Sequence, residues 1–294
     1  MSDVDFVEVI ILVDDYSGYE VRGLVGQHGI SVLMKAVVDG EVSKVIFDVG
    51  QDFRVIKYNV RLLNENLNDV GVVVLSHRHY DHTGGLLGLL KHIKHTVPIV
   101  AHPDITKPNI YIGDGQVKLL IGLPFNISEV DKYGGQLLLT KSVLEVAPGI
   151  YFLGEIPRVI SFEGVPKGFY TLDEGELVRD ELRDDTALAV KVRGLGLVVI
   201  SGCSHSGIVN IVRYTAEVLK DKPYAVIGGL HLIDADEERI KKTIDGLKKL
   251  GVKEVYVGHC TGLRAEYEFL RAYRDKFKKI HSGFRTRFYV KSDQ

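Results

Sequence analysis

The 294-residue chain is poor in several features, and each scarcity excludes a class of protein. Its two cysteines are too few for a disulfide framework, and both lie in motif-like loops, which favours a reducing cytoplasm. No apolar run approaches the roughly 18 residues that a membrane span needs. The acidic residues 1–5 lack the basic start of a signal peptide. We therefore expect a cytoplasmic protein without a membrane partner.

An excess of charge is also missing, because 37 Lys and Arg stand against 39 Asp and Glu, a formal net charge of -2. Without a basic excess, no nucleic-acid partner is expected. Trp is absent and Met is scarce, whereas Lys and Glu are plentiful, which is a weak indication of a thermophile. The length and the apolar fraction of 45% suit a soluble protein with a large core. Nothing in the sequence indicates the oligomeric state.

The most informative stretch starts with the apolar residues 72–75, which predict a buried strand. His77, His79, Asp81 and His82 follow it directly. Imidazole and carboxylate groups bind zinc and similar divalent ions, and residues two apart in extended backbone point the same way. One tetrahedral ion could hardly take all four groups from so tight a turn, so the last two are expected to face a second ion. The alternative is a polar loop that is simply rich in histidine.

Five other apolar strands also end in a loop with Asp, His or Cys, and in four of them a Gly lies within two or three residues. The residues at these ends are Asp48, His102, Cys203 with His205, His231 and His259. Because α/β folds place ligands at strand ends along one sheet edge, six such ends predict one shared pocket and a single domain over residues 1–294. Residues 104–183 are the least regular part and predict a loop-rich insertion or lid.

The pattern His77-x-His79-x-Asp81-His82 at the end of an apolar strand resembles the signature of the metallo-β-lactamase superfamily. The resemblance implies an α/β fold, a four-layer αββα sandwich with its site at one edge of two sheets. It implies two divalent metal ions, with zinc expected and manganese or iron as alternatives. It also implies that Asp48 supports the ligands without binding metal; locally, Asp48 could equally be a turn cap.

The later ligand positions depart in part from the superfamily pattern. His259 matches the last ligand well. Cys203 stands in the place of the usual bridging Asp, with His205 two residues on, and either of the two could bind metal. The alternative for Cys203 is a small buried hydrophobic residue, and the alternative for His205 is a hydrogen-bonded loop residue. Asp185 falls where the third His of the first site is expected, which leaves the occupancy of that site open.

The segment after Cys203 also suggests an anion site. A helix is expected to begin near Gly207, and its free backbone N–H groups could bind a phosphate of the substrate. Ser204, Ser206 and Gly207 are therefore predicted substrate contacts, together with Arg158. The alternatives are a helix cap by Ser206 and a solvated Arg158.

Residues 27–31, 81–86, 202–210, 228–232 and 258–262 narrow the resemblance to one subgroup. They are similar to archaeal and bacterial 7,8-dihydropterin-6-yl-methyl-4-(β-D-ribofuranosyl)aminobenzene 5'-phosphate synthases. This implies a metal-dependent enzyme of methanopterin biosynthesis that condenses a small phosphorylated substrate and releases diphosphate. Asp81, His205 and His231 are the catalytic candidates.

Two other functions stay open at this point. A dinuclear-metal hydrolase of a phosphoester, another ester or a lactone would need the same ligands. A non-catalytic metal-binding or ligand-binding protein is the alternative of another class.

Overall fold

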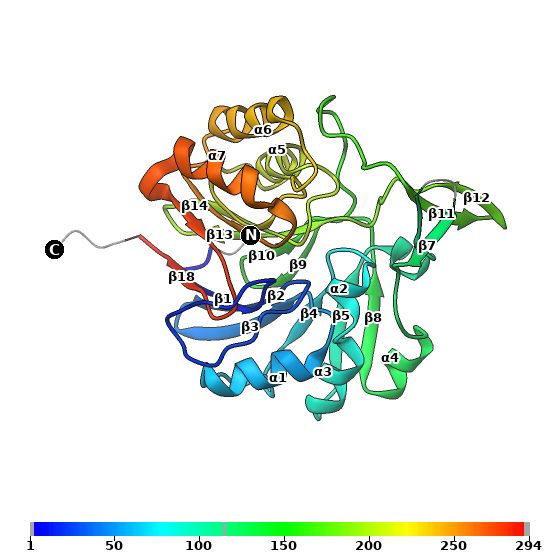
Figure 1. The fold of residues 1–294 in the computed structure, drawn as a ribbon. Helices are drawn as coiled ribbons and strands as arrows, with labels where there is room; N and C mark the ends of the chain where they lie inside the picture. Colours follow the sequence, from blue (N-terminus) through cyan, green and yellow to red (C-terminus); the bar gives the residue numbers. More distant parts are fainter. Residues whose placement is uncertain (1–2, 114–115, 291–294) are drawn as a thin grey trace.

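The computed structural model describes residues 3–113 and 116–290. Two seven-stranded sheets lie face to face, and helices cover the outer face of each sheet (Figure 1). This αββα arrangement confirms the predicted fold class.

The first sheet combines the N-terminal strands with the last strand of the chain. Its order is β18 (Arg285–Phe288), β1 (Phe6–Val13), β2 (Ser31–Val38), β3 (Glu41–Phe47), β4 (Val72–Val74), β5 (Val97–Ala101) and β8 (Gly135–Leu139). The strands from β3 to β8 in this order are parallel. The helices of this half are α1 (Phe53–Leu62), α2 (Tyr80–Thr83), α3 (Leu86–His92) and α4 (Ser128–Lys132).

The second sheet comes from the other half of the chain. Its order is β17 (Phe277–Lys279), β16 (Glu254–Gly258), β15 (Pro223–Gly229), β14 (Gly196–Ser201), β13 (Ala187–Val192), β10 (Ile150–Phe152) and β9 (Leu144–Ala147). The strands from β14 to β17 are parallel. Its outer helices are α5 (Ile208–Leu219), α6 (Glu237–Lys249) and α7 (Leu263–Tyr273), with the short turns η2 (His259–Thr261) and η3 (Arg274–Lys276).

Alternating side chains produce the layers. In β13, Ala187 and Ala189 pack beneath the helices, whereas Leu188 and Val190 pack between the two sheets. Both faces of the strand are buried because successive residues point to opposite faces. A third apolar cluster lies between the first sheet and α1 and α3.

Residues 266–279 do not form a single helix, because Arg274 has a φ of 54°, which ends α7 and leaves room for β17. The segment 104–183, predicted as a loop-rich insertion or lid, contains strands as well as loops. It adds β8 to one sheet and β9 and β10 to the other, and it begins with the short turn η1 (Pro103–Thr106).

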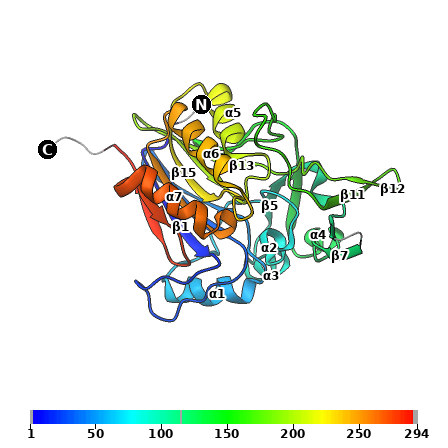
Figure 2. The ribbon, with the colours of Figure 1, turned by 45° about the horizontal axis from the view of Figure 1, so that its top comes forward.

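The same segment forms a third, small sheet beside the sandwich. Its order is β12 (Glu176–Arg179), β11 (Phe169–Asp173), β6 (Ile110–Gly113) and β7 (Gln116–Leu120). Figures 1 and 2 show this sheet projecting from one side of the molecule, beside α2. The strands have only four or five residues and exposed faces, so their hydrophobic pattern is weak in the sequence.

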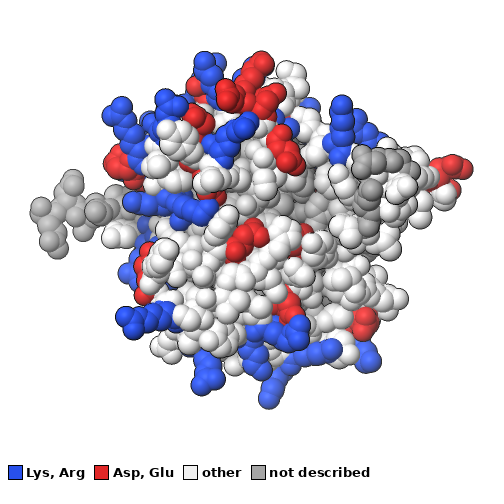
Figure 3. Space-filling view, in the orientation of Figure 1, with Lys and Arg blue, Asp and Glu red and all other residues white. Residues whose placement is uncertain are grey.

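Charges are dispersed over the face in Figure 3, where the described Lys and Arg side chains lie in separate groups and form no continuous basic patch. Within residues 3–113 and 116–290, no helix is both long and apolar enough to span a bilayer.

Candidate metal centre

Strand ends from both sheets bring the predicted ligands together at one edge of the sandwich. β4 leads into the loop that ends in α2, β14 leads to Cys203, and β16 leads to His259. The side chains gathered there are His77, His79, Asp81, His82, Cys203, His205 and His259, and all of them are buried. The convergence expected from the strand ends is therefore present.

Unusual backbone conformations direct the chain at this edge. Asp48, Ser204, His231 and His259 have φ angles between 45° and 61°. Residues other than Gly rarely adopt this region, and such strain collects at functional sites. Each of the four lies at or just beyond the end of β3, β14, β15 or β16, so the strain is concentrated where the candidate ligands meet.

Four of the side chains form the Asp81 cluster, which consists of Asp81, His82, Cys203 and His259. The Sγ of Cys203 lies 3.1 Å from Nε2 of His82 and 3.2 Å from Nε2 of His259. Oδ2 of Asp81 lies 3.3 Å and 3.5 Å from the same two nitrogens. Tetrahedral zinc bonds of about 2.0–2.3 Å would separate ligand atoms by about 3.3–3.7 Å. The cluster therefore fits one ion.

His77, His79 and His205 form the His77 cluster on the other side of Cys203. The His77 ring centre lies 4.5 Å from that of His79 and 4.8 Å from that of His205. The Nε2 of His77 and both ring nitrogens of His205 are buried and have no hydrogen-bond partner among the described residues. Because a buried polar atom without a partner is costly, these nitrogens fit a second ion.

Neighbouring groups fix the orientation of the rings in the His77 cluster. Nδ1 of His77 is hydrogen-bonded to Oγ of Ser76 at 2.9 Å. Nε2 of His79 donates to Oδ1 of Asn109 at 3.1 Å. These bonds leave the opposite nitrogen of each ring, Nε2 of His77 and Nδ1 of His79, available to a metal.

In the Asp81 cluster, two carboxylates fix the orientation of the histidine rings. Asp48 accepts from Nδ1 of His82 at 2.6 Å, and Asp15 accepts from Nδ1 of His259 at 2.7 Å. Nε2 of both rings then faces Cys203. Asp48 thus supports a candidate ligand and lies outside both clusters, as the resemblance implied.

Asp15 also holds His28, and the sequence interpretation missed both residues. Oδ1 of Asp15 accepts from Nδ1 of His28 at 2.8 Å. Nε2 of His28 lies 3.6 Å from Oδ2 of Asp81, and the His28 side chain is 55% exposed. A Cβ at Gly29 would collide with the carbonyl oxygen of Asp81, so Gly allows this close approach. The sequence feature that could have identified Asp15 is its position, because Asp14 and Asp15 directly follow an apolar strand.

Arg78, between His77 and His79, anchors the ligand loop from inside the protein. Its guanidinium is buried and pairs with Asp180 and Asp184, and its backbone N–H donates to Asp184 at 2.8 Å. A buried ion network of this kind fixes geometry more than it adds stability. It ties the loop to the end of the 104–183 segment.

The environment keeps the His77 cluster uncharged. Burial lowers the pKa of His77 and His205 well below the usual range, and neighbouring imidazoles lower it further. Burial lowers the pKa of His79 to about 3. All three rings are therefore neutral near pH 7, which is the form that binds a metal.

The Asp81 cluster holds opposite charges. Burial alone would lower the pKa of His82, but Asp81 and Asp48 raise it well above the usual range. Burial alone would also lower the pKa of His259, but Cys260 and Asp15 raise it to about 9. Metal binding would release protons from these rings.

Asp185 lies at the margin of the His77 cluster. Its Oδ1 is 4.0 Å from Nδ1 of His77 and has no hydrogen-bond partner among the described residues. Its Oδ2 accepts from the backbone N–H of Ser206 at 2.7 Å, and burial raises its pKa to about 6. The contact fixes the loop that carries His205.

The expected phosphate site at the start of α5 is corrected by the structure. The backbone N–H groups of Val209 and Asn210, just after Gly207, donate to the two carboxylate oxygens of Glu163 at 2.9 Å and 2.8 Å. A side chain of the chain itself thus occupies the helix start, because Glu163 reaches it from a distant loop.

The neighbouring polar side chains also point inward. The hydroxyl of Ser204 donates to the carbonyl of Gly229, and that of Ser206 donates to the carbonyl of Asp185, both at 2.7 Å. Neither hydroxyl is free for a substrate, and Ser206 does not cap the helix. Arg158 keeps a buried Nη1 without a partner among the described residues.

The two remaining strand-end histidines differ in position. The His231 ring centre lies 4.3 Å from that of His205, and Nδ1 of His231 has no partner in the described part of the chain. His102 instead donates to Glu155 at 3.1 Å and belongs to neither cluster. It is a loop residue, so β5 does not contribute to the shared site.

Comparison with known proteins identifies the family. A model described as "Beta-lactamase superfamily domain" matches residues 36–109. The chain is 40% identical over 288 residues to the 7,8-dihydropterin-6-methyl-4-(beta-D-ribofuranosyl)-aminobenzene-5'-phosphate synthase of Methanocaldococcus jannaschii, covering 96% of this chain and 97% of that protein. The chain belongs to the metallo-β-lactamase superfamily. It falls in the group that contains this synthase, as the motifs indicated.

Two solved structures share the fold of this chain. Tm1679, described as a metal-dependent hydrolase of the beta-lactamase superfamily, is 30% identical with a TM-score of 0.78, covering 95% of this chain and 98% of that chain. Zn(2+)-bound PqqB from Methylobacterium extorquens shares the fold at 13% identity and a TM-score of 0.53, covering 95% and 99%. The chain is an enzyme of the metallo-β-lactamase fold, as predicted.

Cys203 lies between the two clusters, so its removal is the sharpest test of the centre. We predict that Cys203→Ser weakens metal binding by about 10–100-fold or more while the circular dichroism spectrum is unchanged. Metal per chain after dialysis, measured by atomic emission, provides the readout. Asp69→Ala, which removes a surface carboxylate paired with Lys44, is the control and should retain the wild-type content. Wild-type metal content in Cys203→Ser would remove Cys203 from the ligand set.

The role of Asp15 can be tested separately. Since Asp15 fixes the His259 ring, Asp15→Ala is expected to lower metal affinity by about 10–100-fold, with little change in the thermal midpoint. A titration against a chromophoric chelator measures the affinity. Asp69→Ala, which removes a carboxylate paired with Lys44 at the surface, serves as the control. Equal affinities in the two variants would show that Asp15 does not orient a ligand.

Proposed function

We propose that this enzyme joins a pterin methyl diphosphate to a phosphorylated ribosyl aminobenzene. In this reaction the arylamine nitrogen bonds to the methylene carbon, and the bond from that carbon to the diphosphate oxygen breaks. Diphosphate leaves with the bonding electron pair, and the amine loses a proton. The observation that supports the proposal most directly is the 40% identity to the methanogen synthase along 96% of the chain.

We propose that the enzyme carries two zinc ions, one in each cluster, with Cys203 between them and Asp185 as a further ligand candidate of the His77 cluster. A thiolate beside several imidazoles favours zinc over manganese, and iron is the alternative. Bound there, the ions would supply the positive charge that binds the diphosphate and stabilises the charge developing on it.

His28 is placed to assist at the accessible side of the Asp81 cluster. Asp15 holds its Nδ1, so its Nε2 faces Asp81 at 3.6 Å while the side chain stays 55% exposed. We assign to Nε2 a hydrogen bond to a phosphoryl oxygen of the substrate. Arg158, with its free Nη1, is a second candidate contact for the anion.

The amine proton requires an acceptor. Nδ1 of His231 has no partner in the described chain, and its ring packs against His205. We assign acceptance of the amine proton to His231, whose ring is positioned by His205, and to Asp81 the orientation of the attacking group. We further propose that residues 1–294 act as one domain with 104–183 as the lid, because Asn109 and Phe169 of that segment both approach His79.

Turnover with both substrates tests the proposal. The zinc-loaded enzyme is incubated with the pterin methyl diphosphate and the ribosyl aminobenzene phosphate, and products are identified by mass spectrometry. We expect a product that contains both aromatic groups and one diphosphate released for each product formed. Release should require both substrates and stop with a chelator. Absence of the joined product under metal-replete conditions would refute the synthase assignment.

Hydrolysis is the second candidate, because Tm1679 is described as a metal-dependent hydrolase and matches 95% of this chain at 30% identity. In that case Asp81 would orient a water molecule for attack on a phosphoester, another ester or a lactone. Cleavage of a single substrate without an amine acceptor would favour this function.

A further inference from the structure

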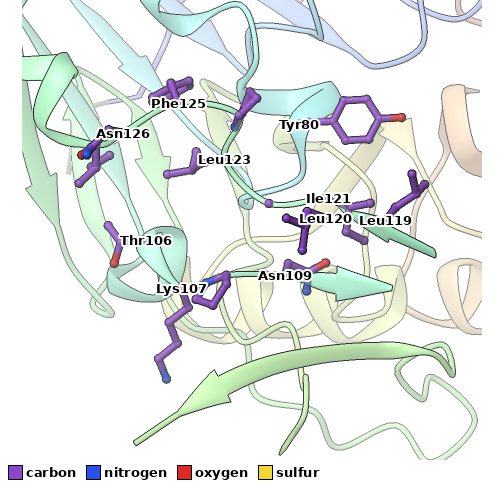
Figure 4. A pocket seen from close by; sticks show the side chains of 14 residues that line it. Tyr80, Thr106, Lys107, Asn109, Leu119, Leu120, Ile121, Leu123, Phe125 and Asn126 are labelled. Atoms are coloured by element: carbon purple, nitrogen blue, oxygen red, sulfur yellow. The ribbon is translucent and has the colours of Figure 1, made fainter. Parts of the chain in front are cut away.

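A pocket of about 730 Å³ lies beside the metal centre, between α2 and the segment 106–127 (Figure 4). Its walls are mainly apolar and include Leu119, Leu120, Ile121, Leu123 and Phe125. The volume is within the range of small-molecule sites. It is large enough for a bicyclic aromatic ring.

The pocket is directly connected to the ligand loop. Tyr80, which stands between His79 and Asp81 in the chain, lines the pocket, and its backbone N–H donates to the carbonyl of Ile121 at 3.0 Å. Asn109 also lines the pocket, and its side chain accepts from Nε2 of His79. A molecule in the pocket would therefore touch residues that hold the His77 cluster in place.

The lining of the pocket carries little net charge, so it suits the uncharged part of a ligand better than an anionic part. Lys107 is the single charged residue among the described residues of the lining, and it lies 3.5 Å from both Asp104 and Asp173. A phosphate would find little positive charge in the pocket, whereas the metal clusters lie next to it. The pocket thus suits an uncharged group, and the phosphate of the same molecule would lie at the metals.

Exposed apolar side chains point to a ligand that covers them. Leu119 is 56% exposed and Leu120 is 77% exposed, although both lie at the rim of the pocket. Covering apolar surface is favourable by about 25 cal/mol per Å². Asn126 and Thr106 supply an amide and a hydroxyl group around the same space, as a flat heterocycle with polar edges needs (Figure 4).

We propose that this pocket binds the planar aromatic portion of a phosphorylated substrate and sets the specificity of the enzyme. The inference rests on the proposed function, which supplies the pterin as the expected aromatic group. Phe125 and Leu123 form part of the wall, and Asn109 connects the wall to the metal centre, because its amide bonds to His79 and Asp180.

Two variants change the pocket in opposite ways. Leu123→Trp fills the space, and Phe125→Ala removes part of the wall. The fluorescence of 6-hydroxymethylpterin, which has no phosphate, reports binding to the zinc-loaded enzyme. We expect each variant to raise its Kd at least about tenfold, which corresponds to one buried apolar side chain. The metal content and the Kd for inorganic diphosphate should not change. Leu263→Ala, 79% exposed on α7, is the control and should bind as the wild type does.

A second aromatic probe separates this inference from the synthase assignment. If the wild type does not bind the pterin but cleaves bis(p-nitrophenyl) phosphate, with a KM that rises at least about tenfold in Leu123→Trp, the aromatic pocket stands and the synthase assignment fails. If the pterin joins the aminobenzene but neither variant changes the Kd or the KM for any aromatic probe, the synthase stands and the pocket assignment is overturned. Unchanged binding of both probes in both variants overturns it as well.

Discussion

The candidate metal centre depends on hydrogen bonds to the clustered histidines. In each case the bond is made by the ring nitrogen that faces away from the cluster. Asp15 bonds to His259, Asp48 to His82, Ser76 to His77 and Asn109 to His79, and each bond turns the other nitrogen of that ring toward its cluster. A histidine ligand without such a partner could present either nitrogen or rotate away. These four residues come from distant parts of the chain, so the two-sheet fold is needed to assemble them. His205 is the exception, since neither of its nitrogens has a partner among the described residues.

The electrostatics of the site follow from the same arrangement. Deep burial keeps His77, His79 and His205 neutral. Two carboxylates favour the charged form of His82, and Cys260 together with Asp15 favours that of His259. The ring nitrogens of the His77 cluster therefore have lone pairs available to a metal ion. The rings of the Asp81 cluster carry protons that a metal ion would displace. Strained backbone at the strand ends keeps these groups together despite the cost of burying them. The fold provides the stability that the site itself lacks.

The sequence predicted the sheet edge and most of the clustered residues, because each follows an apolar strand whose end could be recognised. Cys203 and His259 were found in this way. Asp15 was missed although it also follows a strand. Since β2 is antiparallel to both β1 and β3, the ends of β1 and β3 lie at the same edge of the sheet, which brings Asp15 to the site. Asn109 and Glu163 could not be predicted, because they lie in a segment without clear periodicity and act through contacts that only the tertiary structure creates. The phosphate site predicted at the start of α5 was wrong for the same reason, because the carboxylate of Glu163 occupies that helix start.

The segment that was least informative in the sequence connects substrate choice with metal geometry. Its Asn109 bonds to His79, its Asp180 pairs with Arg78 of the ligand loop, and its Phe169 ring lies 5.5 Å from that of His79. The other candidate ligands follow strands of the two large sheets, whereas this segment forms most of the pocket lining and part of the support of the His77 cluster. A change at Asn109 would therefore alter the pocket wall and a candidate metal ligand together. We therefore infer that substrate binding and metal geometry are coupled through the Asn109–His79 hydrogen bond, because Asn109 lines the pocket and bonds to a candidate metal ligand.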